Sequence, residues 1–387
     1  MTTTGCQTTD WLHSDEQEEL QRTVRRFLQN TCPTTEVRRI METDLGHDPA
    51  VWARMADELG LQGLMIPEEY GGVGLGAVEL ALVMEEMGRA LLPAPFLASS
   101  VLAAGALLAS DDEAAKRNLL PGIASGRSIA TVAPVDDRGG WGPDGARIQA
   151  RRRGSGFALD GVVTFVLDGH VADLVLVPAR TDNGVSLFAV TADGPGVTRT
   201  RSTTLDRTRP QARIELAGTP ASLIGVEGTA TSWLARAVDR AAVALAAEQI
   251  GGARHCLEAS IGYAKERVQF GRPIGSFQAV KHALADLFIE IELASAAVQH
   301  AAWAAEHASG ELPAAAALAK AYASDAYWHT AVANVHVHGG IGFTWEHDAH
   351  LYFKRAKSSQ VQLGEPAVLR ERLAREIGLA AFAGTAR

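Results

Sequence analysis

The chain has 387 residues, of which 47% are hydrophobic and 21% are charged, and its formal net charge is −9. A chain of this length divides into two or three domains, and the composition is that of an ordinary globular protein. The negative charge disfavours general nucleic-acid binding, which depends on a basic face. No stretch reaches the roughly 20 uncharged apolar residues that a membrane-spanning helix needs.

The first residues of the chain contain neither a basic region nor an apolar run, so no secretory signal is predicted and the expected location is cytoplasmic. Cys6, Cys32 and Cys256 have neither CxxC nor metal-ligand spacing, which predicts reduced thiols. His336 and His338 lie close together, but no carboxylate or cysteine stands at ligand spacing beside them. No metal site is therefore expected.

The beginning of the chain has the pattern of amphipathic helices. Ser14 followed by Gln17 has the form of a capping box, which predicts that a first helix begins there. Further helices are predicted over 51–59 and 78–92, each ended by a glycine or a proline. Residues 1–125 are therefore expected to form an N-terminal α-helical domain.

From about Ile129 the pattern changes to short β-branched runs separated by Asp-Gly, Asn-Gly and Pro-Gly turns, which predicts a β-barrel-like middle domain over 126–226. Long alanine-rich helical segments then return, predicted at 234–265, 277–308 and 313–336, with a last helix near 366–379. They predict a C-terminal four-helix bundle over 227–387. The fold class is thus α+β and multidomain.

The stretch from Val238 to Ala279 organises the chain. A long helix with apolar residues at intervals of three, four and seven is predicted to be buried, and a turn rich in glycine and proline ends it. Arg267 and Arg272 place two cations in that turn, which suits a phosphate-bearing ligand. From the residues alone, an ordinary loop between packed helices is the preferred interpretation.

The segment YAKERVQFGRPIGSFQA resembles the signature segment of the acyl-CoA dehydrogenase family. The matching residues are Tyr263, Arg267, Phe270, Gly271, Ile274 and Gln278. Blocks at 60–90 and 335–357 also resemble family blocks in the expected order, so the resemblance covers nearly the whole chain. It is greatest to actinobacterial members that act on steroid side chains and other bulky acyl thioesters.

The resemblance implies an FAD cofactor that lies between the β domain and the bundle, with one end held partly by a neighbouring subunit. The implied contacts to the diphosphate and adenosine are Arg267, Phe270 and Gln278, with His336, Gly339 and Gly340 contributing from the partner side. At the flavin ring, the family's two hydroxyl-bearing positions correspond here to Val132 and Leu167. Phe165 keeps the shape of the second segment, while the hydroxyl contacts are lost.

The catalytic base is the weakest match. The family's usual glutamate position corresponds to Leu363, and the position used by a minority of members corresponds to Ala241. Glu248 is the predicted base, because it lies two helical turns beyond Ala241 in an apolar run where burial would raise its pKa. The alternative is that Glu248 forms a buried ion pair with Arg254 or another cation. Glu365 is the reserve candidate, and a partner chain is a further source.

Two functions from different classes follow from the resemblance. The first is FAD-dependent α,β-dehydrogenation of an acyl-CoA, or of a carrier-protein thioester, to a trans-2-enoyl product, with an electron-transfer flavoprotein as acceptor. The second is a non-catalytic partner subunit that completes the FAD site of another chain. Asp239 matches a residue that contacts the CoA pantetheine arm, although a helix N-terminal charge is an equal interpretation. A homotetramer or heterotetramer is expected, because the cofactor site is shared between subunits.

Overall fold

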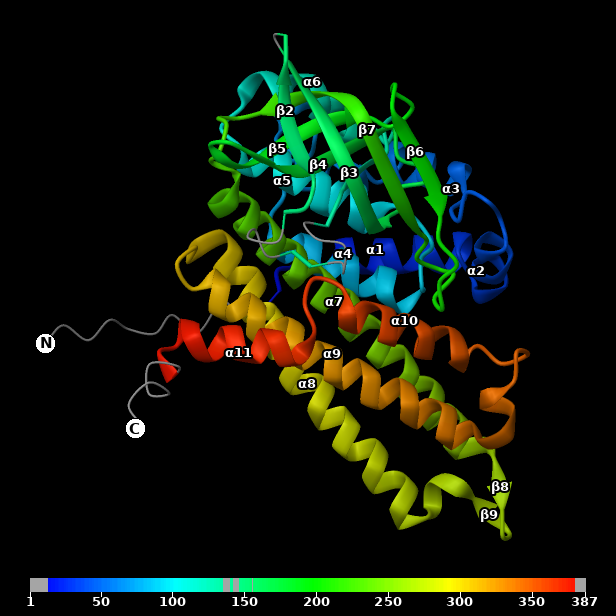
Figure 1. Ribbon diagram of the computed structural model, residues 1–387. Helices are drawn as coiled ribbons and strands as arrows, with labels where there is room; N and C mark the ends of the chain where they lie inside the picture. Colours follow the sequence, from blue (N-terminus) through cyan, green and yellow to red (C-terminus); the bar gives the residue numbers. More distant parts are fainter. Residues whose placement is uncertain (1–12, 135–139, 142–145, 155, 380–387) are drawn as a thin grey trace, which may run out of the picture.

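The computed structural model describes residues 13–134, 140–141, 146–154 and 156–379. Figure 1 shows the strands of the middle region at one end of the molecule and the long helices of the C-terminal half extending away from them. The N-terminal helices pack at the junction between these two parts. The predicted order of helical, β and helical regions is confirmed.

The N-terminal region is helical throughout. Its main elements are α1 (Asp15–Thr31), α2 (Thr34–Met41), α3 (Pro49–Asp57), α4 (Ala77–Arg89), the π-helical η3 (Leu97–Ala103), α5 (Ala104–Ala109) and α6 (Glu113–Ala124), with short 3₁₀ turns η1 (Leu61–Gly63) and η2 (Glu68–Tyr70). The predicted capping box is confirmed, since the Gln17 amide donates to Ser14 Oγ at 3.3 Å and the Ser14 amide donates to Gln17 Oε1 at 2.9 Å.

The middle region is a small closed barrel. Its strands are β1 (Ala130–Val132), β2 (Gln149–Arg153), β3 (Gly156–Leu167), β4 (Leu174–Thr181), β5 (Gly184–Thr191), β6 (Val197–Arg201) and β7 (Gln211–Ile224). Strands β2, β3, β7, β5 and β4 pair in that order, and β4 pairs back to β2 through Arg180 and Gln149, which closes the ring. The β-barrel-like prediction is therefore confirmed.

The C-terminal region is built on the 37-residue helix α7 (Ala230–Glu266). It continues through the hairpin β8 (Val268–Gln269) and β9 (Arg272–Pro273), the 3₁₀ turn η5 (Ile274–Ser276), α8 (Gln278–His307), α9 (Leu312–His338), the 3₁₀ turn η6 (Gly339–Phe343), α10 (Ala349–Val361) and α11 (Pro366–Glu376). The long helices pack against one another, and α7 also packs along α4. The hairpin lies at the end of the bundle that is remote from the barrel (Figure 1).

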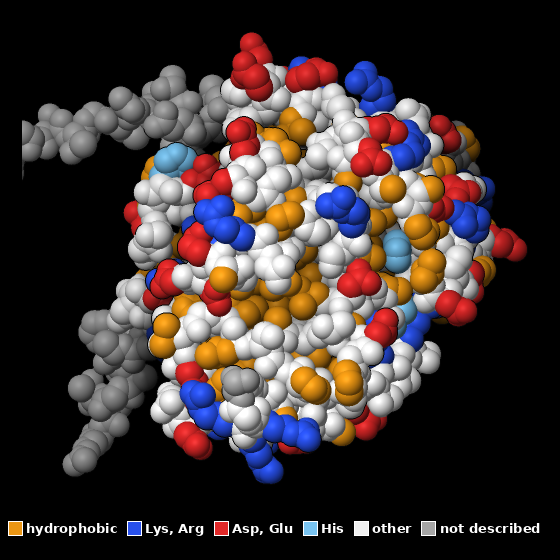
Figure 2. Space-filling view, turned by 90° about the horizontal axis from the view of Figure 1, so that it is seen from above, with side chains coloured by type: hydrophobic (Ala, Val, Ile, Leu, Met, Phe, Trp, Pro, Cys, Tyr) orange, Lys and Arg blue, Asp and Glu red, His pale blue; other side chains and the backbone are white. Residues whose placement is uncertain are grey.

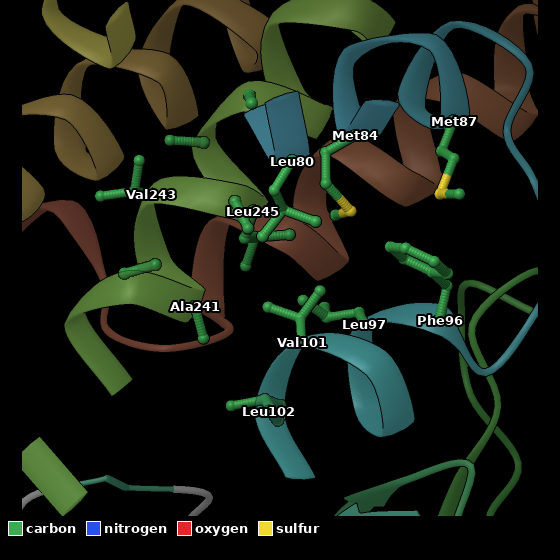
Figure 3. Packing of buried hydrophobic residues seen from close by; sticks show 14 of the residues in the cluster. Leu80, Met84, Met87, Phe96, Leu97, Val101, Leu102, Ala241, Val243 and Leu245 are labelled. Carbon is green, nitrogen blue, oxygen red and sulfur yellow. The ribbon is translucent and has the colours of Figure 1, made fainter. Parts of the chain in front are cut away.

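Helices α4 and α7 approach closely because glycines face the contact. A Cβ atom added at Gly251 would lie 1.7 Å from the carbonyl oxygen of Glu85, and one added at Gly88 would lie 1.9 Å from that of Glu248. Around this contact, Figure 3 shows apolar side chains from α4, η3 and α7 that pack together, including Met84, Val101 and Ala241. One hydrophobic core therefore joins the N-terminal helices to the bundle.

The surface carries charges of both signs. In the view of Figure 2, hydrophobic side chains gather near the middle of the face, and acidic and basic side chains lie mostly toward its margin. Within the described residues, no helix combines the length and hydropathy needed to cross a membrane, and no three metal-ligating side chains come together.

Candidate active site

A cavity of about 860 Å³ lies between the barrel, the first turns of α7 and the C-terminal segment. Its lining includes Pro134, Trp141, Phe165 and Gln211 from the β region, Val238 and Asp239 from α7, and residues 361–365 together with Val368 and Arg372. Phe165, predicted at the flavin ring, and Asp239, predicted at the pantetheine arm of CoA, thus line the same cavity. A second cavity of about 490 Å³, between α1, α4, α7 and α8, includes none of the predicted site residues in its described lining.

The barrel wall of the cavity is shaped by an irregularity near the end of β3. The pairing of β3 with β7 shifts just before Val166, and Phe165 has a φ of 60°. The bulge directs the Phe165 side chain outward, where it is 47% exposed. Val132 and Leu167 are buried, and the Leu167 carbonyl accepts a hydrogen bond of 2.7 Å from Thr131 Oγ1. Neither of these two positions presents a hydroxyl to the cavity.

The opposite wall is the turn between α10 and α11. Leu363, which by resemblance corresponds to the family's usual base position, has a φ of 56° and a side chain that is 4% exposed. A left-handed conformation is uncommon for such a residue, so the surrounding structure holds this turn in place. Glu365, two residues later, lines the same cavity and is exposed. The turn therefore presents an apolar side chain where a base is expected.

Asp239 is held by an arginine from the last helix. Arg372 donates to both carboxylate oxygens, at 2.5 and 2.7 Å, and Asp239 is only 2% exposed. Burial raises the pKa of Asp239, and the guanidinium opposes that rise. The helix dipole acts mainly on charges in the first turn of a helix. Since α7 begins at Ala230, Asp239 lies well past that turn. The helix N-terminal interpretation of Asp239 is therefore wrong.

Glu248 is the centre of a buried ion-pair cluster. Its carboxylate accepts from Arg209 Nη2 through both oxygens, at 2.5 Å for Oε1, and from Arg355 Nη1 at 2.9 Å. Burial alone would raise the pKa of Glu248, but the charges and hydrogen bonds of the two arginines outweigh it and lower the pKa. The prediction that the pKa of Glu248 is raised is therefore wrong. The suggested ion pair with Arg254 is also wrong, since Arg254 donates to Glu292 at 2.6 Å.

A general base must reach the proton that it removes. Glu248 is 4% exposed and is not among the described residues that line the cavity. A carboxylate in this position, paired with two arginines, is a structural charge. The structure does not favour Glu248 as a base.

The residues expected at the diphosphate and adenosine lie far from this cavity. Arg267 and Phe270 are at the hairpin that follows α7, Gln278 begins α8, and all three are exposed, Phe270 to 91%. His336 and Gly339 end α9 nearby, where the Tyr263 ring lies 4.4 Å from that of His338. The structure therefore separates the predicted cofactor residues into two groups within one chain.

Glycine backbone is accessible in this remote group. Within the described part of the chain, a Cβ atom added at Gly271, Gly339 or Gly340 would meet no heavy atom within 4 Å beyond the adjoining residues of its own segment. Gly271 has a φ of 78° and Gly339 a φ of 63°. A ligand could thus approach the backbone closely beside the Arg267 cation.

Four buried charged residues in or beside this cluster were not identified from the sequence: Arg209, Arg355, Asp206, which accepts from Arg355 at 3.0 Å, and Lys320, which donates to the Ser359 carbonyl at 3.0 Å. The burial of Lys320 could have been suspected from the sequence, because Lys320 is a lone cation in an alanine-rich helical run. In the structure it is 0% exposed. Arg209 and Arg355 come from segments with other exposed cations, so their burial has no local signature.

Comparison with known proteins decides the family. The model described as "Acyl-CoA dehydrogenase, N-terminal domain" matches residues 14–127, and the one described as "Acyl-CoA dehydrogenase, C-terminal domain" matches residues 231–378. The chain belongs to the acyl-CoA dehydrogenase family. Members of this family are FAD-dependent oxidoreductases, and FAD is the cofactor of the fold.

The relatives include acyl-CoA dehydrogenase IpdE2 of Mycolicibacterium smegmatis, which is 35% identical over 364 residues, 94% of this chain and 99% of the relative. Among solved structures, the ChsE4-ChsE5 complex from Mycobacterium tuberculosis has a TM-score of 0.86 at 32% identity, over 98% of this chain and 100% of the other. A variant of the Tcur3481-Tcur3483 steroid ACAD has a TM-score of 0.85 at 34% identity, over 95% and 98%. The resemblance to steroid acyl-CoA dehydrogenases is thereby confirmed.

The two groups of residues in this acyl-CoA dehydrogenase fit FAD unequally. The remote group offers an exposed arginine, an exposed aromatic ring and unobstructed glycine backbone, which fit a diphosphate and an adenine. At the barrel wall, the side chains of Val132 and Leu167 are buried and apolar, so they offer the flavin ring no hydrogen bond. The chain fits one end of FAD well and the other end poorly.

Proposed function

We propose that this chain is a subunit of a heteromeric acyl-CoA dehydrogenase. Its exposed hairpin end completes the FAD site of a partner chain, and the partner supplies the catalytic carboxylate. The complex oxidises a steroid side-chain thioester, or another bulky acyl-CoA, to a trans-2-enoyl-CoA. An electron-transfer flavoprotein is the proposed electron acceptor.

The observation that carries this proposal is the contrast between the two cofactor groups. Arg267, Phe270 and Gln278, which by resemblance serve a neighbouring subunit's FAD, are present and exposed. The residues that would serve the chain's own flavin ring and base have become apolar, at Val132, Leu167 and Leu363. The chain therefore retains the residues that would bind a neighbouring subunit's FAD, but lacks polar groups at its own flavin-ring and base positions. This combination suits a partner subunit.

The surface of α8 supports a subunit contact. Phe288, Ile289 and Leu293 are 53%, 55% and 54% exposed on neighbouring turns of this helix. Apolar clusters of this kind on a soluble protein mark interaction sites. A heterotetramer of two chain types accounts for this surface, and the ChsE4-ChsE5 complex is such a pairing of two chain types in relatives of this protein.

A second candidate function rests on Glu365. This carboxylate lines the cavity and lies two residues from the usual base position, so a small shift of the turn would bring it toward a substrate. The chain would then be a complete catalytic subunit of a homotetramer. The two candidates differ in whether the isolated chain binds FAD and reacts.

The deciding experiment compares the chain alone with the chain co-expressed with a related acyl-CoA dehydrogenase that carries a glutamate at the position matching Ala241 or Leu363. Flavin content is measured by absorbance near 450 nm, and reduction by bleaching with a bulky acyl-CoA. The heteromer proposal expects little flavin in the chain alone and a yellow, reducible complex. Stoichiometric FAD in the chain alone, bleached by substrate, would contradict it.

A further inference from the structure

Arg209 lies in the segment between β6 and β7 and reaches from the barrel into the helical bundle. Its Nη2 donates to the Glu248 carboxylate of α7, and its Nη1 donates to Ser359 Oγ of α10 at 3.0 Å. The residue is only 7% exposed. A single guanidinium therefore joins the segment between β6 and β7 to α7 and α10.

The barrel side of Arg209 continues directly into one wall of the cavity. The next residue, Pro210, accepts a hydrogen bond of 3.0 Å at its carbonyl from the Asp168 amide. Gln211 then pairs with Leu167 in the sheet and lines the cavity together with Phe165. Arg209 thus directly precedes the two residues that hold the end of β3, where the ring-side residues lie.

The bundle side of Arg209 leads to the opposite wall. Ser359 accepts from Arg209 at Oγ, and its carbonyl accepts from Lys320 Nζ at 3.0 Å. Lys320 also donates to the Gln360 carbonyl at 3.4 Å and is 0% exposed. Two residues further on, the chain enters the 361–365 turn that carries Leu363 and Glu365. The end of α10 is therefore held through the Ser359 side chain and through the backbone carbonyls of Ser359 and Gln360.

Arg209 and Arg355 form buried ion pairs with Glu248 and Asp206. Arg355 donates from Nε to Asp206 Oδ2 at 3.0 Å and from Nη1 to Glu248 at 2.9 Å, and Arg209 pairs with Glu248. Two cations thus face two carboxylates, and all four side chains are buried. Because buried charges without partners are costly, the arrangement has little freedom to shift.

We propose that Arg209 is a positioning residue that sets the separation between the two walls of the cavity, the end of β3 and the 361–365 turn. It acts through Glu248 and Ser359 on the bundle side and through Pro210 on the barrel side. Its importance for the reaction rests on the proposed function of the cavity, but the positioning itself is a property of this chain and is tested on the chain or its complex.

The test is hydrogen–deuterium exchange of the Arg209→Met variant in the protein as it is isolated. Peptides covering 163–168 and 359–365 should both exchange at least roughly tenfold faster, while peptides from β5 and α8 keep their rates. The Arg209→Met/Glu248→Gln variant removes a cation and an anion together, leaving the Arg355–Asp206 pair. It should regain most of the thermal stability lost by Arg209→Met, yet keep fast exchange at both walls.

The matched control is Arg25→Met, which removes an ion pair of 2.7 Å to the buried Glu86 between α1 and α4, away from the cavity. It should lower stability without changing exchange at 163–168 or 359–365 relative to the rest of the chain. Two results would overturn the proposal: unchanged exchange at 359–365 in Arg209→Met, or wall exchange that follows global stability in every variant. Either would reduce Arg209 to a general structural role.

Discussion

Arg372 in α11 donates two hydrogen bonds, of 2.5 and 2.7 Å, to Asp239 in α7, across one side of the cavity. The last helix of the chain is thereby joined to the central helix at the position that, by resemblance, contacts the pantetheine arm of CoA. Any ligand group that uses Asp239 must compete with this guanidinium or bind beside the ion pair.

The Arg372→Ala variant should be destabilised by about 2–3 kcal/mol, because it leaves a buried carboxylate without its charged donor. Urea unfolding at pH 7.5 measures the change. The Arg375→Ala variant is a matched control on the same helix, since the Arg375 side chain is 65% exposed and its ion pair with Glu371 lies at the surface. It should change stability by less than about 0.5 kcal/mol. Equal effects of the two variants would contradict the structural importance of the Asp239 pair.

Asp168 gives a pH-dependent prediction. Burial raises the pKa of its carboxyl to about 7, while Arg209, Arg355 and Arg201 oppose the rise. An unfolded aspartate titrates near 3.9, so the native state binds more protons than the unfolded state between these values, and stability falls as pH rises from about 4 to about 7. The Asp168→Asn variant has no such titration. Its free energy of unfolding should exceed that of the wild type by on the order of 2–4 kcal/mol at pH 8, and the difference should become smaller toward pH 5.

Asparagine suits this position because the φ of Asp168 is 50°, a left-handed conformation that asparagine tolerates. Thermal unfolding at pH 5, 6, 7 and 8 measures the difference from the wild type. The exposed Asp182, in the turn between β4 and β5, provides the control Asp182→Asn. If the stability difference between Asp168→Asn and the wild type does not change with pH, the raised pKa of the buried Asp168 carboxyl is refuted.

The architecture was accessible from the sequence because it depends on local patterns. Helical periodicity located α1 and α7, and turn chemistry located the β region, but barrel closure depends on the Arg180–Gln149 pairing between separate strands. The resemblance predicts that Leu363 stands at an altered base position, and this stays a prediction. The partners of Glu248 were not predictable, since Arg209 and Arg355 are 39 and 107 residues away in sequence.

Arg267 gives the prediction for cofactor binding. In the heteromeric complex, Arg267→Ala should weaken FAD binding by about 1.5–3 kcal/mol, roughly 10- to 150-fold in Kd, because it removes a charge-assisted contact to the diphosphate. Flavin released during dialysis, measured by fluorescence, reports the loss. Arg236→Ala, an exposed cation near the other end of α7, should leave flavin retention unchanged. Equal retention in both variants would remove the hairpin from the cofactor site.

The last prediction concerns the source of the catalytic carboxylate. In the heteromeric complex, Glu365→Gln in this chain should change the rate of flavin reduction by acyl-CoA less than about twofold. The corresponding change of the partner's glutamate should lower the rate at least roughly 10²-fold, the low end for a general base. The reason is that Glu365 is an exposed N-cap residue of α11, two residues from Leu363, the position that by resemblance matches the family's usual base.

Stopped-flow absorbance near 450 nm measures the reduction, with flavin content determined for each variant so that loss of cofactor is not mistaken for loss of chemistry. Glu371→Gln, on the exposed face of α11, is the matched control for removing a charge from this helix. If Glu365→Gln slows reduction by two orders of magnitude at full flavin content, the base belongs to this chain. The second candidate function, a complete homomeric enzyme, would then replace the heteromeric one.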